Sequence, residues 1–377
     1  MRRHSTLPRP GWQSKVESTG LTFHSFTSQK YWDESAYWEF TSAEVDRIEA
    51  ATHELQRLCL AAGDHILEHN RFAEMRIPER AIPLIRETWQ NEPPALYGRM
   101  DLAFDGRNLK LLEYNADTPT SLLEASVTQW YWLLDKFPDA DQFNSIHEKL
   151  VAKWRDLKPY VADPLYFVHD PAEEDRITVT YLRDTAHQAD IRTEALLMRD
   201  IGWKAKERTF VDLEDRPMRS IFKLYPWEWL LTDSFADHVF ETAEPVQWIE
   251  PAWKMLWSNK ALLAVLWELF PGHELLAPAY LDGPRELTSY ARKPILGREG
   301  ANISIVREGI TMDATGGEYG AQGYVWQQYV DLAASGSTRA ILGSWLIDGE
   351  AAGIGVRESD GLIVTNTSRF VPHLFRE

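Results

Sequence analysis

Apolar residues recur at helical spacing between residues 42 and 69, and this periodicity predicts a long amphipathic helix. Thr41 and Glu44 stand three residues apart just before the apolar run, which is the pattern of a capping box that opens a helix. Cys59 falls on the apolar stripe and is expected in the core rather than in the role of a nucleophile. Shorter helices are predicted over residues 82–89, 122–137, 185–201 and 259–269.

Alternation of apolar and polar residues predicts strands between these helices. Residues 96–117 are expected to form a hairpin, because Asp105-Gly106 interrupts an alternating run. A second hairpin is expected near the C-terminus, where Asp348-Gly349 separates two strand-like runs. Further strands are predicted over residues 165–169, 177–182, 220–224 and 323–330, whereas residues 1–40 are expected to be irregular.

The first predicted hairpin gathers polar groups on one face. Arg99 and Asp101 alternate with apolar neighbours on its first strand, and Glu113 and Asn115 are two residues apart on its second. Two carboxylates and an amide are oxygen ligands that suit Mg²⁺. A two-residue turn at Asp105-Gly106 would put Glu113 on the face opposite Asp101, so a magnesium site requires a bulge or an odd-length connection. The alternative is the solvated face of a half-buried hairpin.

Two lysines and a glycine-bearing segment follow later in the chain. Lys260 is expected in the first turn of a helix, where free backbone N–H groups favour phosphate. Lys293 ends a predicted strand, and the backbone after it, with Gly297 and Gly300, is of the kind that approaches phosphate oxygens closely. The strand-like residues 324–330 offer backbone groups for an adenine edge. An ordinary surface lysine and a bare turn remain the alternatives, because this segment has neither the P-loop pattern nor Gly-x-Gly-x-x-Gly.

Charge and composition narrow the class of partner. The net charge of −17 argues against nucleic acid, which requires a surplus of Lys and Arg. An acidic surface attracts cations such as polyamines, although solubility alone also accounts for it. No apolar run is long enough to span a membrane or to serve as a signal peptide, so no membrane partner and a cytoplasmic location are expected.

The ordered set of short motifs resembles the glutathionylspermidine synthase family. The resemblance covers roughly residues 15–375 and implies an α+β ATP-grasp fold, circularly permuted, with an N-terminal pre-ATP-grasp-like region. The matching segments are Tyr31-Trp32-Asp33-Glu34, Gly98-Arg99-Met100-Asp101, Leu112-Glu113-Tyr114-Asn115-Ala116-Asp117, Asn259-Lys260, the stretch from Arg292-Lys293-Pro294-Ile295 to Asn302-Ile303, Gln327-Gln328-Tyr329, Gly353-Ile354-Gly355-Val356-Arg357 and Ser368-Arg369-Phe370-Val371-Pro372.

The resemblance also implies a division of the chain. Residues 1–30 are expected to be an irregular N-terminal segment, and residues 31–375 the synthetase region. Within that region we expect a part with the metal-binding hairpin at residues 31–145, a pre-ATP-grasp-like part at 146–257, and the ATP-binding lid with the C-terminal strands at 258–375.

Residue by residue, the resemblance assigns roles to positions that match the family. Arg99 would stabilise the transition state and contact ATP, and Asp101, Glu113 and Asn115 would hold Mg²⁺. Thr118 stands where the family uses a serine to contact glutathione. The other implied ATP contacts are Lys260, Lys293, Glu299, Gly300, Gln328, Tyr329 and Arg357. The acidic run Glu173-Glu174-Asp175 roughly occupies the place of the family's substrate acids, and Glu173 and Glu174 are the other implied substrate contacts.

The function implied by the resemblance is an ATP-dependent carboxylate–amine ligase. With ATP and Mg²⁺, it would join a peptide-like, glutathione-like acid to a polyamine-like amine through an acyl phosphate. Bifunctional family members carry an amidase with a nucleophilic cysteine, and because Cys59 is the one cysteine here, amide hydrolysis is not expected. A non-catalytic module that binds ATP, peptide or polyamine and an ATP-dependent phosphotransferase are the alternatives. The sequence leaves the acid, the amine and the oligomeric state open.

Overall fold

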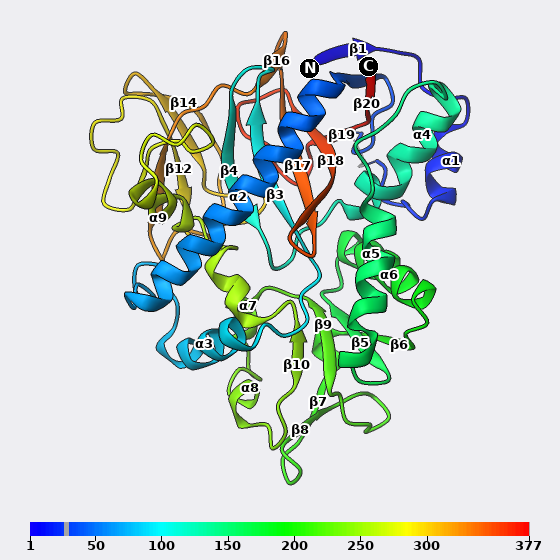
Figure 1. The fold of residues 1–377 in the computed structure, drawn as a ribbon, viewed down its shortest axis with the longest axis vertical. Coiled ribbons are helices and arrows are strands. Elements are labelled where there is room, and N and C mark those ends of the chain that lie inside the picture. The colour runs from blue at the N-terminus through cyan, green and yellow to red at the C-terminus, as the bar shows by residue number, and fades with distance from the viewer. Residues whose placement is uncertain (26–29, 377) are drawn as a thin grey trace.

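The computed structural model describes residues 1–25 and 30–376 (Figure 1). A long helix, α2 (Ser42–Glu68), crosses in front of the central sheet in this view. The Thr41 side chain accepts a hydrogen bond from the Glu44 N–H, and the Glu44 carboxylate accepts one from the Thr41 N–H. The predicted helix and its capping box are therefore confirmed, as is the burial of Cys59 in the core.

The central sheet is antiparallel and joins the early part of the chain to its end. Its strand order is β19 (Arg369–Val371), β18 (Glu350–Ser359), β17 (Thr338–Ile347), β3 (Tyr97–Phe104) and β4 (Leu109–Asn115), with β16 (Ala333–Ser335) added on β17. Both predicted hairpins, β3–β4 and β17–β18, are confirmed. The register between them sets Asp101 opposite Gly343, so the two hairpins form one surface.

A second antiparallel sheet lies beside the first. Its order is β11 (Ala279–Tyr280), β15 (Tyr324–Gln328), β12 (Tyr290–Pro294), β13 (Ser304–Arg307) and β14 (Ile310–Ala314). Helix α9 (Leu262–Leu269) packs against β11 and β15. The prediction that Lys260 lies in the first turn of this helix is wrong, because the Lys260 N–H donates to the Ile295 carbonyl and the helix begins two residues later.

The third sheet is parallel, and the sequence prediction failed in part of it. Its order is β10 (Gln247–Ile249), β9 (Ser220–Leu224), β5 (Leu165–His169) and β6 (Thr193–Leu197), flanked by α5 (Ile146–Leu157) and α6 (Glu173–Gln188). The strand predicted over residues 177–182 lies inside α6, and the helix predicted over 185–201 ends at Gln188. The β-branched run of residues 177–180 misled the prediction, because burying one face of α6 outweighs local strand preference.

The two ends of the chain also form structure where irregular chain was expected. Strand β1 (Arg2–Ser5) pairs with β2 (Ala36–Thr41), which pairs with β20 (His373–Arg376), and α1 (Trp12–Ser18) lies between them in sequence. The expectation for residues 1–40 was therefore wrong for these elements, and its part over 26–29 lies outside the described residues. Among the described residues, no helix is long and apolar enough to cross a membrane.

The remaining helical predictions hold with local changes. Helix α3 (Ile82–Asn91) is confirmed, and the helix predicted over residues 122–137 begins with a π-helical turn, η2 (Glu124–Thr128), that leads into α4 (Gln129–Lys136). The smaller elements are η1 (Glu79–Ala81), η3 (Lys158–Tyr160), η4 (Met198–Asp200), β7 (Gly202–Lys204), β8 (Thr209–Val211), α7 (Trp227–Leu230), α8 (His238–Glu241) and η5 (Ala252–Leu256).

A buried ion pair fixes the start of β3. The Glu250 carboxylate accepts hydrogen bonds from the N–H groups of Leu96 and Tyr97 and pairs with the Lys254 ammonium. Lys254 in turn donates to the Tyr97 carbonyl at 2.6 Å. Both charged side chains are almost fully buried, so each depends on the other for compensation of its charge.

We expect Lys254→Met to lower the free energy of unfolding by about 3–5 kcal/mol, because it leaves the Glu250 carboxylate buried without its cation. The control is Lys15→Met, which removes a surface pair with Asp135 and is expected to cost less than about 1 kcal/mol. Urea unfolding followed by circular dichroism measures both changes. Equal losses for the two variants would contradict a structural role of the buried pair.

Candidate active site

An extra residue in β4 sets the arrangement of the hairpin's polar side chains. Leu102 pairs with Leu111 but Asp101 pairs with Glu113, so Leu112 forms a bulge between them. The predicted irregularity is confirmed, although it lies in the strand and not at the Asp105-Gly106 turn. The bulge brings Glu113 opposite Asp101, as a shared metal site requires.

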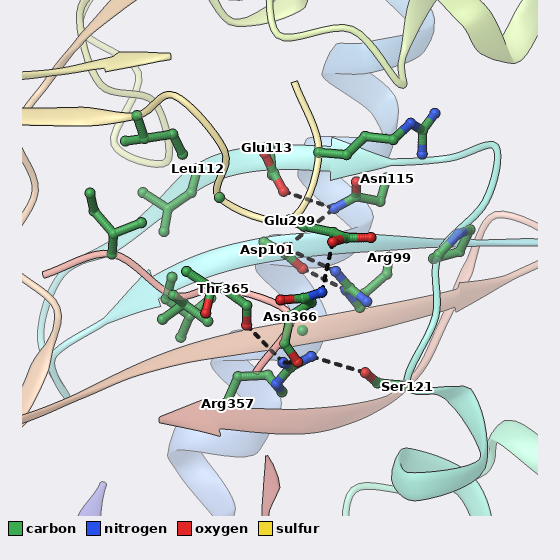
Figure 2. A pocket seen from close by; sticks show the side chains of 18 of the residues that line it. Arg99, Asp101, Leu112, Glu113, Asn115, Ser121, Glu299, Arg357, Thr365 and Asn366 are labelled. Atoms are coloured by element: carbon green, nitrogen blue, oxygen red, sulfur yellow. Dashed lines mark hydrogen bonds and ion pairs between the residues drawn. The ribbon is translucent and has the colours of Figure 1, made fainter. Parts of the chain in front are cut away.

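Four polar side chains of this hairpin form one network (Figure 2). The Arg99 guanidinium donates two hydrogen bonds to Asp101, at 2.7 and 3.1 Å. The Asn115 amide nitrogen bridges the two acids, donating to Asp101 at 3.2 Å and to Glu113 at 3.0 Å. Arg99 lies across Gly343 of β17, where an added Cβ would approach the Arg99 side chain to 2.8 Å. The glycine therefore leaves the space that the guanidinium stem occupies.

Both predicted lysines reach this network from other elements. Lys260 pairs with the Glu113 carboxylate at 2.8 Å and donates to the Gly297 carbonyl at 2.6 Å. Lys293 on β12 donates to the carbonyl of the bulge residue Leu112 at 2.9 Å. The second sheet is thus joined to the first at the site itself.

Gln327 is a site residue that the sequence analysis missed. It is buried on β15, accepts a hydrogen bond from Lys293 at 2.8 Å and donates to the Leu111 carbonyl at 2.8 Å. Its predicted neighbour Gln328 is exposed. Strand alternation indicates that the two glutamines face opposite sides, but the sequence does not say which side is inward.

Burial and the neighbouring opposite charges shift the pKa values of these groups in opposite directions. Burial alone would raise the pKa of the Glu113 carboxyl, but Lys260 and Lys293 outweigh it and hold that pKa below its usual range. Burial raises the pKa of Asp101 against the opposing influence of Arg99. Burial lowers the pKa of Lys293 to about 8. Three cations and two carboxylates therefore share a space from which most water is excluded.

A cavity extends from this network between the first two sheets. One end is polar, with the hairpin residues, and the other is apolar. The backbone N–H of Gln328 donates to the Pro278 carbonyl, and that of Tyr329 to the Ser289 carbonyl, so neither donor faces a ligand. The apolar lining includes Ala291, Ile303, Ile305, Leu332, Leu362 and Ile363.

Two segments close over the cavity, residues 295–303 (the covering loop) and residues 360–368 (the C-terminal loop). Glu299 of the covering loop accepts a hydrogen bond from the Asn366 amide at 2.7 Å. Gly300 has φ +73°, and an added Cβ would lie 2.6 Å from the Val364 carbonyl oxygen. The two loops therefore touch through a backbone contact that only glycine permits.

Arg298 of the covering loop was also missed. It donates to Thr118 at 2.7 Å and to Glu228 at 2.7 Å, and all three residues lie near the cavity wall. Thr118, a predicted substrate contact, lines the cavity. Because Arg298 bridges elements far apart in sequence, its position is a product of tertiary structure.

The predicted acidic run at the start of α6 is divided by the fold. Glu174 and Asp175 line the cavity, whereas Glu173 is exposed and accepts a hydrogen bond from Thr22 at 2.7 Å. Burial raises the pKa of Asp175 to about 7, and the charge of Glu174 adds to this rise. Arg357 lines the cavity beside the C-terminal loop. The fold thus brings every predicted site residue except Glu173 to the cavity or to its hairpin network.

The chain matches, over residues 3–376, the family model described as glutathionylspermidine synthase pre-ATP-grasp. It belongs to the glutathionylspermidine synthase family. It is 41% identical to a candidate acid–amine ligase of Haemophilus influenzae, with all of both chains covered.

Two further family relatives are longer than this chain. It is 27% identical to the trypanothione synthetase of Crithidia fasciculata, over 84% of this chain and 55% of that one. It is 28% identical to the bifunctional glutathionylspermidine synthetase/amidase of Escherichia coli, over 89% of this chain and 58% of that one. The chain therefore spans a little over half the length of these two relatives.

We expect Gly300→Ala to separate the covering loop from the C-terminal loop, because its Cβ would clash with the Val364 carbonyl. The matched control is Gly336→Ala, where φ is +63° but nothing lies within 4 Å of an added Cβ. Each alanine bears the strain of a left-handed backbone, about 1–2 kcal/mol, and only Gly300→Ala adds the clash. Limited proteolysis should cut the two loops faster in Gly300→Ala alone, and equal cutting of both variants would refute the contact.

Proposed function

We propose that this family member is an ATP-dependent carboxylate–amine ligase, which forms an amide bond between a peptide-like acid and a polyamine-like amine. The observation that carries the proposal is the polar network on β3 and β4, with Lys260 and Lys293 converging on it from a second sheet. Acidic side chains that suit a metal ion lie there within hydrogen-bond distance of cationic and amide side chains, and the cations suit phosphates.

The cavity is suited to ATP along its whole length. Lys260, Lys293 and Arg99 would offset the charge of the polyphosphate at the polar end. The apolar end, between Ile303 and Ile363, would take the adenine ring, with Tyr329 and Gln328 beside it. Glu299 and Gly300 would cover the phosphates from the covering loop, and Arg357 of β18 would do so beside the C-terminal loop.

The hairpin residues fit Mg²⁺ because their oxygens form the hard donor set that this ion prefers. Asp101, Glu113 and Asn115 would hold it. Asn115 already lies within hydrogen-bond distance of both acids, so the three side chains converge without a change of backbone. When bound, the ion would neutralise charge on the phosphate oxygens.

The chemistry requires activation, because a free carboxylate and an ammonium do not condense at neutral pH. The acid's carboxylate oxygen attacks the γ-phosphorus of ATP, the bond to ADP breaks, and an acyl phosphate forms. The amine then attacks the acyl carbon, and phosphate leaves with the bonding electrons. Arg99 would stabilise the negative charge that develops in both steps. The two loops would keep out the water that otherwise hydrolyses the acyl phosphate.

Substrate positions follow from the charges on the cavity wall. We assign the acid substrate to the side of Thr118 and the cationic amine to Glu174, while Glu173 takes no part because it faces away. We further propose a circularly permuted ATP-grasp fold, in which the part that contains the metal-binding hairpin (residues 31–145) precedes the pre-ATP-grasp-like part (146–257) and the lid with the C-terminal strands (258–375). An ATP-consuming reaction of this kind suits the cytoplasm.

The test is phosphate release from MgATP with a panel of peptides, glutathione included, crossed against a panel of amines. We expect one pair to give an adduct whose mass, by mass spectrometry, equals that of the two substrates together less one water. One ADP should form for each adduct. A phosphorylated product would favour a phosphotransferase. Tight MgATP binding without turnover of any pair would favour a binding module.

We expect Arg99→Ala to lower kcat/KM for the active pair by a hundredfold or more, on the order of 3 kcal/mol of transition-state stabilisation. The matched control is Arg155→Ala, an exposed arginine of α5 away from the cavity, which should retain wild-type turnover. Full activity of Arg99→Ala would remove its assigned role.

Nucleotide affinity should fall as pH rises from 7 to 9. The pKa of Lys293 is lowered to about 8, so its ammonium form, which pairs with phosphate, is lost over this interval. We expect the affinity for MgATP to drop by up to about tenfold in fluorescence titrations. Lys293→Arg stays charged and should flatten the dependence. The same slope in wild type and variant would assign the titration to another group.

A further inference from the structure

Glu124 is a buried carboxyl next to the cavity for which the proposed reaction has no use. It begins the π-helical turn η2, and π-helical turns concentrate at functional sites. The Tyr31 hydroxyl donates to the Glu124 carboxyl oxygen at 2.6 Å. Burial raises the pKa of Glu124 to about 7. Burying a carboxyl here costs free energy, so its hydrogen bond with Tyr31 calls for an explanation.

The contact continues as a directed chain of hydrogen bonds. Because the Tyr31 proton points to Glu124, the Tyr31 oxygen accepts from the Ser121 hydroxyl at 2.9 Å. The Ser121 oxygen then accepts from the Arg357 guanidinium at 3.0 Å. Arg357 also lies over the Tyr31 ring, 5.3 Å from its centre. Each group donates to the next, and the carboxyl of Glu124 terminates the chain.

The other side of Arg357 holds the C-terminal loop. Its guanidinium donates to the carbonyls of Thr365 and Asn366, each at 2.9 Å, and to that of Ser368 at 3.2 Å (Figure 2). Three carbonyls of one loop thus converge on a single side chain. The Asn366 side chain then reaches Glu299 of the covering loop. The orientation of Arg357 therefore sets the position of both loops over the cavity.

We propose that Tyr31 and Glu124 are positioning residues, which fix the C-terminal loop over the cavity by orienting Arg357. Neither side chain contacts the hairpin network, so neither is assigned a catalytic role. The Tyr31 hydroxyl links Glu124 to Arg357 through Ser121, and the buried carboxyl of Glu124 fixes the direction in which that hydroxyl donates. The effect on turnover rests on the proposed ligase function, whereas the effect on the loop does not.

The experiment is hydrogen exchange of the full chain by mass spectrometry, with Tyr31→Phe as the variant. Loss of the hydroxyl should raise exchange in residues 360–368 about tenfold, as expected when one ordering hydrogen bond is lost. The matched control is Tyr37→Phe on β2. It removes a hydroxyl from a ring that packs against Trp132 and Phe137. The control should leave the C-terminal loop unchanged.

Glu124→Gln provides a second variant of the same size, which keeps an acceptor but removes the charge. It should raise exchange in the C-terminal loop by less than Tyr31→Phe does. Unchanged exchange there in both variants, or an equal rise throughout the parallel sheet, would overturn the proposal. In the ligase assay, Tyr31→Phe should raise KM for MgATP severalfold with little change in kcat. A chain without ligase activity would sink the proposed function and leave the exchange result to decide this inference.

Discussion

The bulge at Leu112 sets the geometry on which the rest of the site depends, because one inserted residue has two effects. It places the Glu113 side chain on the face that carries Asp101. It also leaves the Leu112 carbonyl to accept from Lys293, a residue of the other sheet. The same irregularity therefore brings the two acids together and joins their strand to Lys293 of the second sheet. A regular ladder supplies no extra residue for both effects.

Most charges of the site are paired within the protein. Arg99 neutralises Asp101, and Lys260 neutralises Glu113, in surroundings where an uncompensated charge is costly. The third cation, Lys293, donates to the Leu112 carbonyl and to the Gln327 amide oxygen. In the proposed reaction, the phosphates and the divalent cation would contact these same groups, so the pairs between protein side chains would have to rearrange.

The sequence predicted the elements that carry the candidate site better than it predicted the surrounding fold. Period and turn chemistry are local, so α2 and the two hairpins were visible in short windows. An irregularity in the first hairpin was also predicted, but at the Asp105-Gly106 turn, whereas the structure has it at Leu112 of β4. Residues 177–182 look like a strand alone and become a helix because α6 buries one face on the parallel sheet. Gln327 and Arg298 could not be found, because their partners come from distant segments. The family resemblance supplied the roles, which spacing alone leaves open.

The sheet formed by β1, β2 and β20 brings the two ends of the chain close together. Strand β2 has β1 on one side and β20 on the other, so the first and last strands are separated by two strand spacings, about 10 Å. Figure 1 shows the N and C labels side by side at the top of the view. The path of the chain nearly closes on itself. Where the two ends fall along this path therefore has little effect on how the helices and strands pack. Any partner domain tethered to either end would therefore leave from this three-stranded sheet.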